Sequence, residues 1–138
     1  MADIVSKATR SRMMAGIRGK NTKPEITVRS HLHGLGLRFR LHVRDLPGKP
    51  DIVLPRWRAI VQVHGCFWHQ HTGCRFAYMP ASNRTFWRTK LRGNFARDQR
   101  NNELLRLLGW RVFVVWECEV GDVAILRKLT RNIRRGTT

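Results

Sequence analysis

The chain has 138 residues, 42% of them hydrophobic, which suits one folded domain and excludes a disordered basic tail. Its 27 Lys and Arg residues against 9 Asp and Glu residues give a formal net charge of +18, which favours a polyanionic partner such as a nucleic acid. No apolar run approaches the roughly 18 residues that a membrane-spanning helix needs.

Cysteine usage and the N-terminal residues indicate the compartment. The chain has three cysteines, and an odd number argues against a secreted disulfide framework and favours metal ligation in a reducing compartment. The first residues lack the basic and then apolar layout of a signal peptide. We therefore expect a cytoplasmic protein that forms a single domain over residues 1–138.

The chain begins with a basic segment and a helix. Residues 1–20 are polar and basic without a strong period, and we interpret them as an N-terminal arm. The spacing of Thr22 and Glu25 is typical of a capping box, with Pro24 in the first turn. The pattern predicts a helix that ends near Gly34.

Three strands are predicted next. Apolar and basic side chains alternate over residues 37–44, which indicates a strand with one buried face and one basic face. Residues 51–54 form a short apolar run after a turn. Residues 59–63 form another, and this third strand places His64 at its end.

The second half of the chain predicts a helix, a strand and a helix. Residues 83–108 have a helical period, with an interruption expected near Gly93. Successive apolar residues predict a strand over 111–116 that is buried on both faces. A last helix is expected over 122–133, followed by a basic tail at 134–138. This order predicts an α/β fold with a central mixed β-sheet flanked by helices.

The segment from His64 to Cys74 reads His-Gly-Cys-Phe-Trp-His-Gln-His-Thr-Gly-Cys and concentrates residue types that bind zinc. A structural zinc site has four nitrogen or sulfur ligands, and the chain has one further cysteine, Cys118. We predict a closed zinc site formed by Cys66, His71, Cys74 and Cys118. Two alternatives stay open: His69 ligates zinc in place of His71, or the cysteines are unpaired buried thiols.

A second metal site is indicated by Asp51. This residue starts the strand over residues 51–54, and the next strand, over residues 59–63, ends beside a polar residue. This is the pattern of the metal site in restriction-endonuclease-like nucleases. Mg²⁺ prefers oxygen ligands and keeps most of its waters, so one carboxylate and a backbone carbonyl can hold it beside a phosphate. The usual second acid and lysine are replaced by Gln62, Val63 and His64. By itself, Asp51 could equally be a turn residue or a strand cap.

Several motifs follow one another in the order and spacing of one enzyme family. They are Lys7-Ala8-Thr9-Arg10-Ser11, Pro47-Gly48-Lys49-Pro50-Asp51, His64-Gly65-Cys66-Phe67-Trp68-His69, Phe86-Trp87, and Leu108-Gly109-Trp110-Arg111-Val112 with Val115-Trp116-Glu117-Cys118. On these residues, most of the chain resembles the very-short-patch repair (Vsr) endonucleases. The resemblance implies a restriction-endonuclease-like fold, a structural zinc ion and Mg²⁺-dependent nicking on the 5′ side of the thymine in a T:G mismatch. Such mismatches arise when 5-methylcytosine deaminates.

The resemblance also implies roles for individual residues. Asp51 would be the metal-binding carboxylate, and Val63 would give its backbone carbonyl to Mg²⁺. His69 would act as the general base or orient the attacking water, for which an imidazole outside the zinc site is suited. His64 would contact the phosphate or relay a proton, and Glu25 would hold a metal-bound water or His69. The alternatives are a capping role for Glu25 and a buried, hydrogen-bonded role for His64.

Aromatic residues near this site are candidates for mismatch recognition. In the Vsr-like interpretation, Phe67, Trp68 and Trp87 form a wedge from the major-groove side. Flat side chains that enter between base steps unstack a duplex, and this costs least at a mismatch. Trp110 and Trp116 are assigned to the core.

Other DNA contacts are predicted in the arm and among the basic residues. Met14 would enter from the minor-groove side, Arg10 belongs to the arm motif, and Lys49 would contact DNA near the scissile bond. Phosphate contacts supply affinity without reading sequence. The residues expected to make them are Arg38, Arg40, Arg44, Lys90, Arg92, Arg97, Arg100 and those of the tail at 134–138.

The leading hypothesis is a Mg²⁺-dependent nickase that starts very short patch repair on double-stranded DNA with a T:G mismatch. We expect a monomer associated with the bacterial nucleoid, and mismatch-repair proteins are further candidate partners. One alternative is a zinc-stabilised DNA-binding module without catalysis. Another is a nuclease of the same fold that acts on a different mismatch or on a restriction site.

Overall fold

A mixed sheet of four strands forms the centre of the computed structural model, which describes residues 22–135. The strands lie side by side in chain order: β1 (Arg40–Leu41), β2 (Ile52–Leu54), β3 (Ala59–His64) and β4 (Arg111–Trp116). β2 is antiparallel to both of its neighbours, whereas β3 and β4 run parallel. The predicted mixed sheet is therefore confirmed. The expected arm over residues 1–20, with Arg10 and Met14, lies outside the described residues.

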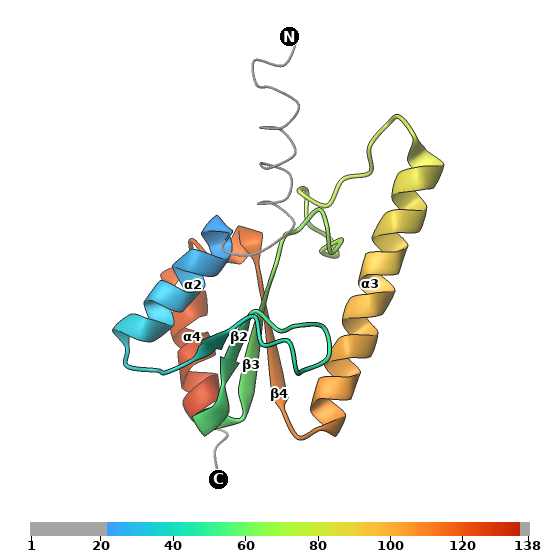
Figure 1. Cartoon of the computed structure of the whole chain (residues 1–138). Helices are drawn as coiled ribbons and strands as arrows, with labels where there is room; N and C mark the ends of the chain where they lie inside the picture. Colours follow the sequence, from blue (N-terminus) through green and yellow to red (C-terminus); the bar gives the residue numbers. More distant parts are fainter. Residues whose placement is uncertain (1–21, 136–138) are drawn as a thin grey trace, which may run out of the picture.

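Helices cover both faces of this sheet (Figure 1). α2 (Lys23–Gly34) and α4 (Val123–Arg135) share one core cluster with the sheet, and α3 (Arg84–Leu107) packs against its other face. Two short 3₁₀ helices, η1 (Pro55–Trp57) and η2 (Glu117–Glu119), follow β2 and β4. The described elements follow the predicted order, so the α/β class is confirmed.

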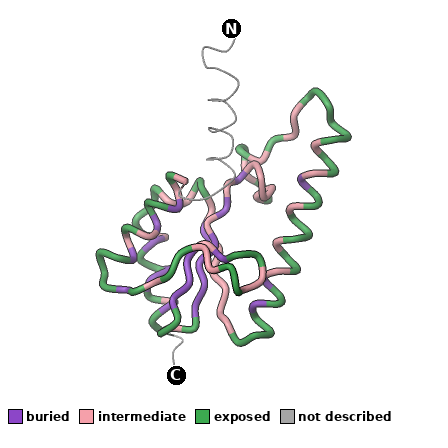
Figure 2. The backbone as a smooth tube through the Cα atoms, in the orientation of Figure 1, coloured by how far each residue is buried: buried purple, intermediate pink, exposed green. Residues whose placement is uncertain are grey.

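The core lies on both sides of the sheet because successive strand residues point to opposite faces. Ile52 and Leu54 belong to the cluster with α2 and α4, whereas Val53 between them packs with Leu105 of α3. Figure 2 shows the buried residues gathered on the central strands. The main cluster consists of Val28, Leu32, Leu37, Ile52, Leu54, Ala59, Val61, Val115, Leu126, Leu129 and Ile133.

The start of α2 follows the sequence prediction in part, because Thr22 caps the helix but the Glu25 side chain bonds to His42 and Arg29 and completes no capping box. The Thr22 hydroxyl oxygen accepts a hydrogen bond from the backbone N–H of Glu25 at 3.4 Å, and a proline occupies the first turn. Val28 and Leu32 lie one turn apart and are fully buried, which holds the helix on the sheet. The capped end of α2 consequently points Glu25 into the interior, where it is 2% exposed.

The predicted strand over residues 37–44 is wrong in its length. Only Arg40 and Leu41 pair with β2, and both are exposed. The backbone of His42 is left-handed, with a φ of 47°, which ends the strand. β2 also offers only three residues for pairing. The alternation still identifies the side chains that pack inward, because Leu37 is buried and Phe39 packs against the main cluster.

The prediction that the strand over 111–116 is buried on both faces is also wrong. Val115 is the buried residue of β4, and its other residues are half-buried. β4 is an edge strand of the described sheet and pairs only with β3. In the core cluster on the α3 side, Leu105 is the buried α3 residue. An edge strand that is covered over part of its length keeps partial exposure.

The two C-terminal helices differ from their predictions in continuity and in length. α3 runs through Gly93 without the expected interruption. The amide of Asn94, the next residue, donates to the carbonyl oxygen of Trp68 at 3.1 Å. α4 includes Arg134 and Arg135, which were predicted as part of a tail. Within residues 22–135, no helix is both long and apolar enough to cross a membrane.

Candidate active site and metal centre

A cleft of about 1480 Å³ opens beside the start of α2, the start of β2, the end of β3 and one side of α3. Four of the nine carboxylates in the chain line it: Glu25, Asp51, Asp98 and Glu117. Basic residues line it as well, among them Arg44, Lys49, Lys90 and Arg97. Acidic groups inside a basic cleft suit a site that holds a cation against a polyanion.

Asp51 is fixed between two strands. It comes directly before β2, and its Oδ2 accepts a hydrogen bond from the backbone N–H of Val63 at 2.9 Å. Its own N–H donates to the side-chain oxygen of Gln62 at 3.3 Å. Burial raises the pKa of Asp51 to about 6, the Val63 N–H opposes this shift, and the nearby charge of Glu25 adds to it. A buried carboxylate with a raised pKa is stabilised in its charged form by a bound cation.

The loop before Asp51 is held against α3 by a close contact at Gly48. A Cβ atom at Gly48 would lie 2.8 Å from Asn101 Nδ2 and 3.0 Å from Asn101 Cβ, and the φ of this glycine is +76°. Both facts require glycine here. Lys49 follows with a left-handed φ of 47°, and Pro50 is fully buried. This turn aims Lys49 and Asp51 at the same cleft.

Glu25 forms a buried cluster with His42. Its Oε2 lies 2.8 Å from His42 Nε2 and 3.3 Å from Arg29 Nη1. The ligand atoms of Glu25, His42 and Asp51 all lie within 4.8 Å of one another. The carboxylate of Glu25 is therefore next to Asp51, and its hydrogen-bond partners are His42 and Arg29 and not the backbone of its own helix cap.

The two predicted catalytic histidines lie face to face. The rings of His64 and His69 have centroids 3.9 Å apart and planes inclined by 5°. His64 is at the end of β3 and is 7% exposed, whereas His69 comes from the loop that follows. His69 Nδ1 is hydrogen-bonded to Asp98 Oδ2 of α3. Within the described residues, the buried Nδ1 of His64 has no hydrogen-bond partner.

The imidazole rings of His64 and His69 have different electrostatic surroundings. Burial lowers the pKa of His64 to about 4, and the neighbouring charge of His69 lowers it further, while Asp98 opposes the shift. Near pH 7, His64 is therefore neutral. The Asp98 carboxylate is hydrogen-bonded to the other ring of the pair, that of His69.

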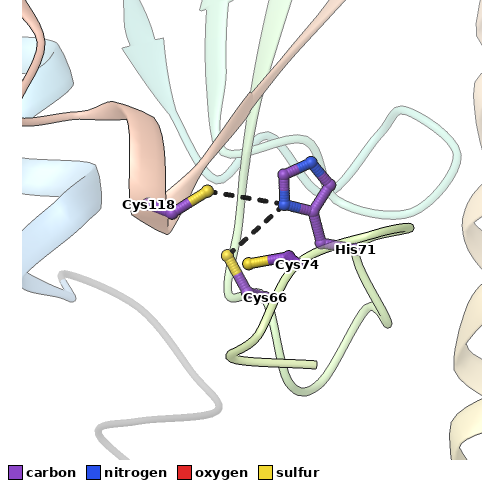
Figure 3. Close-up of side chains that lie close together, drawn as sticks. All are labelled: Cys66, His71, Cys74 and Cys118. Atoms are coloured by element: carbon purple, nitrogen blue, oxygen red, sulfur yellow. Dashed lines mark hydrogen bonds between the residues drawn. The ribbon is translucent and has the colours of Figure 1, made fainter. Parts of the chain in front are cut away.

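The four predicted zinc ligands come together from two segments (Figure 3). Three belong to the loop after β3, and Cys118 belongs to η2 after β4. His71 Nδ1 lies 3.7 Å from Cys66 Sγ and 3.4 Å from Cys118 Sγ. The ligand atoms of Cys66, His71, Cys74 and Cys118 all lie within 4.8 Å of one another. Three thiols and one imidazole are a donor set that zinc prefers, so these residues fit a structural zinc ion.

Local backbone and ring contacts support this cluster. Gly73, between His71 and Cys74, has a φ of +75°, which closes the ligand loop. Burial raises the pKa of Cys66 to about 12, so its thiolate form requires a nearby cation. Trp116, predicted as core, is half-buried and stacks on His71 with centroids 4.1 Å apart. Its ring also meets His64 edge-on at 5.1 Å, so Trp116 separates the thiol cluster from the histidine pair.

The three aromatic residues predicted to form a wedge lie together beside the cleft. Phe67 lies 5.0 Å from Trp68 and 5.6 Å from Trp87 between ring centroids, and the two tryptophans are 5.9 Å apart. All three are half-buried. Tyr78 packs on Phe67 and Phe86 packs on Trp87, and both are largely exposed. The predicted group of three rings is thus part of a group of five.

Sequence reasoning missed Asp98 and His42. Asp98 lies in a predicted helix that is rich in basic residues, and it was not singled out. Its position between Arg97 and Arg100, in a chain with few carboxylates, could have indicated a functional acid. His42 was interpreted as one of the basic residues of an alternating strand. No local pattern indicated that it would contact Glu25, which is 17 positions away.

Only some of the residues predicted to contact phosphates line the cleft. Arg44, Lys90 and Arg97 line the cleft. Four others are exposed elsewhere on the surface: Arg38, Arg40, Arg92 and Arg100.

Comparison with known proteins adds independent information about this chain. Residues 2–75 match the family model described as DNA mismatch endonuclease Vsr. The chain is 51% identical over 133 residues to the type II nicking enzyme V.XorIIP of Xanthomonas oryzae pv. oryzae, which covers 96% of this chain and 97% of that protein. It is 45% identical over 118 residues to the DNA mismatch endonuclease Vsr of Escherichia coli, which covers 86% and 75%. A third relative, the type II nicking enzyme V.NmeAIP of Neisseria meningitidis, is 43% identical over 135 residues, covering 97% and 96%.

The matched segment includes the four residues predicted as catalytic, all of which line the cleft. Glu25, Asp51, His64 and His69 all lie within residues 2–75. The similarity to two of these relatives extends over nearly the full length of the chain. By this match and these identities, the chain belongs to the Vsr family of DNA mismatch endonucleases.

Proposed function

We propose that this nicking endonuclease is Mg²⁺-dependent, recognises a T:G mismatch in duplex DNA and cleaves the strand on the 5′ side of the thymine. The observation that carries the proposal is that Asp51 and the His69–Asp98 pair line the same basic cleft. Phosphodiester hydrolysis needs a metal-binding oxygen, a base for the attacking water and positive charge for the phosphates.

Asp51 and the backbone carbonyl of Val63 would hold the magnesium ion. The fit rests on Asp51, since burial and the charge of Glu25 destabilise its carboxylate unless a cation is near. When bound, the ion would polarise the scissile phosphate and lower the pKa of a bound water. Glu25, whose carboxylate lies within 4.8 Å of that of Asp51, would orient a water of the same site.

His69 would be the general base. Asp98 holds the Nδ1 side of the ring, which fixes the tautomer in which Nε2 carries the lone pair. Nε2 can then take the proton of the attacking water while Asp98 stabilises the imidazolium that forms. His64 stays neutral beside it and would contact the phosphate or pass on a proton.

The group of five rings would recognise the mismatch. Phe67, Trp68 and Trp87 would enter the duplex where a mispair makes unstacking least costly. A zinc ion in the thiol cluster would hold the loop that carries Phe67 and Trp68, because Cys66 directly precedes them. Lys49 would contact the phosphates near the scissile bond, and Met14 and Arg10 would act from the arm.

The proposed setting follows from the relatives, which are bacterial proteins. We propose a monomer that acts in the bacterial cytoplasm on nucleoid DNA, with mismatch-repair proteins as further partners. The restriction-endonuclease-like fold is proposed on the same resemblance. Membership of an endonuclease family argues against a DNA-binding module without catalysis.

A panel of duplexes tests the proposed function. It should contain every mispair and the matched control, each in several sequence contexts and with or without Mg²⁺. We expect one nick, in the thymine strand of T:G, that leaves 5′-phosphate and 3′-hydroxyl ends and requires the metal. Preferential nicking of another mispair, or of a matched site, would favour the alternative target and refute the T:G assignment.

A further inference from the structure

The outward face of α4 carries a continuous positive charge that the proposed cleavage does not use. Beyond Ala124, every exposed residue of this helix is basic. The inward face is apolar and buried through Leu126, Leu129 and Ile133. We call the outward set the α4 basic stripe: Arg127, Lys128, Arg131, Arg134 and Arg135.

Arg134 has a structural contact, since it donates to the carbonyl oxygen of Leu35 at 2.8 Å, but helix stability does not account for the other cations. α4 contains no Asp or Glu, so no acid within the helix offsets its cations. Arg127, Arg131 and Arg135 are spaced by four residues, and like charges at this spacing destabilise a helix. The helix dipole favours cations only in the last turn, which leaves Arg127, Lys128 and Arg131 without that benefit. A bound polyanion would remove the repulsion.

The stripe lies away from the proposed active site. α4 belongs to the core cluster on one face of the sheet, and α3, which lines one side of the cleft, packs on the other face. α2 shares the α4 face of the sheet and lines the cleft only through its first residues, Lys23 to Glu25. Among the residues that line the cleft, none belongs to α4. A short duplex in the cleft therefore leaves the α4 basic stripe available for another ligand.

We propose that the α4 basic stripe binds a second segment of duplex DNA while a first segment occupies the cleft. Arg135 lies eight positions after Arg127, which is about 12 Å along a helix. Duplex DNA carries one negative charge per about 1.7 Å of its axis, so this length faces several phosphates. This proposal rests on the proposed function in one respect: the first duplex is assumed to bind in the cleft.

The stripe suits DNA better than it suits an acidic protein. Protein interfaces have an apolar or aromatic centre, and the α4 basic stripe contains no apolar side chain. Phosphate contacts need charge alone and read no sequence. An enzyme with two such faces can pass between DNA segments without full release, which shortens the search for rare mismatches in long DNA.

A capture experiment tests the stripe with the full-length protein. A short T:G duplex is immobilised, loaded with protein in the absence of Mg²⁺ and washed, and a fluorescent matched duplex is then added. We expect the wild type to retain the second duplex. Arg127→Gln/Lys128→Gln/Arg131→Gln should lower this retention about tenfold or more. It should also reduce the salt slope of the second binding step by about 0.9 for each phosphate that the protein no longer neutralises.

Two controls make the result specific. Arg127→Lys/Arg131→Lys keeps the charge at the same exposed positions and should retain the second duplex as the wild type does. The melting temperature of the glutamine variant should equal or exceed that of the wild type, because repulsion is removed without change to the core. Nicking of the short T:G duplex by each variant reports separately on the proposed function.

The outcomes distinguish the two proposals. Failure of the wild type to hold a second duplex, or equal capture by the glutamine variant, would overturn the role of the stripe whatever the nicking result. Binding of polyglutamate in place of the second duplex would identify an acidic protein as the partner and would also overturn it. Capture without any nicking would support the stripe and count against the proposed function.

Discussion

The rings of His64 and His69 stack nearly parallel, with centroids 3.9 Å apart. Two imidazolium ions cannot stably occupy this arrangement, because like charges would face each other at contact distance. The pKa of His64 is lowered to about 4, first by burial and then by the charge of His69. The stack therefore keeps His64 neutral near pH 7 beside the ring of His69.

Asp98→Asn should remove the group that orients His69. The amide would no longer stabilise an imidazolium and could hold the ring in the wrong tautomer. We expect nicking to fall by about 10² to 10⁴, the range that general-base catalysis supplies. Single-turnover nicking of a T:G duplex measures this loss, and binding should change little.

Glu103→Gln, which changes an exposed acid on the same helix, is the matched control and should nick at the wild-type rate. An unchanged rate in Asp98→Asn would show that His69 works without its carboxylate partner. It would remove the assignment of His69 as an Asp98-oriented base.

The pH dependence of nicking should depend on the magnesium concentration. The pKa of Asp51 is raised to about 6 by burial, so protons and Mg²⁺ compete for this carboxylate below that pH. The apparent magnesium affinity should therefore fall by about tenfold per pH unit as the pH drops below 6. Rates measured over a grid of pH and Mg²⁺ test this, and an acid limb that does not move with Mg²⁺ would contradict it.

Cys118→Ser should remove one of the four zinc ligands and loosen the loop after β3. We expect the bound zinc to fall below one ion per chain and the melting temperature to drop by about 10 °C, because metal binding contributes to folding. Metal analysis and a thermal melt measure the two effects.

Thr72→Ser, an exposed change within the same loop, is the control and should keep both zinc and stability. A chelator should lower the melting temperature of the wild type and have less effect on Cys118→Ser. Full zinc occupancy in Cys118→Ser would exclude this cysteine as a ligand.

Trp87→Ala should weaken the distinction between mispaired and matched DNA. Trp87 contacts Phe67, Trp68 and Phe86, so its loss removes a stacking surface from the group of five rings. Stacking on an aromatic side chain is worth about 1–3 kcal/mol, so kcat/KM on T:G should fall about 10- to 100-fold. Phe76→Ala, at an exposed ring that stacks with Arg75, should change it little. Equal losses in the two variants would indicate a nonspecific effect.

Local sequence patterns predicted the features that depend on residue type and on spacing along the chain. The cap at Thr22, the placement of Asp51 before β2 and the four-residue thiol cluster were all recoverable from residue type and spacing. The length of β1 was not, because a left-handed backbone at His42 ends it. The continuity of α3 through Gly93 was not recoverable either, because the Asn94 amide is used by the distant Trp68.

The partners of the site residues required three-dimensional information. Asp98 is 29 positions from His69, and His42 is 17 positions from Glu25. Nothing in the period of a helix or a strand specifies such pairs, since they form only when the loop before β2 meets α2 and the loop after β3 meets α3. For the same reason Trp116 was assigned to the core, although it separates the two clusters.

The central claim is that Asp51 holds the ion that drives strand cleavage, and nicking by Asp51→Asn tests it most directly. A T:G duplex should be bound by the wild type and the variant with similar affinity. In saturating Mg²⁺ the variant should nick at least about 10³-fold more slowly, because the metal loses its carboxylate ligand. Nicking of the thymine strand at the wild-type rate by Asp51→Asn would contradict the account.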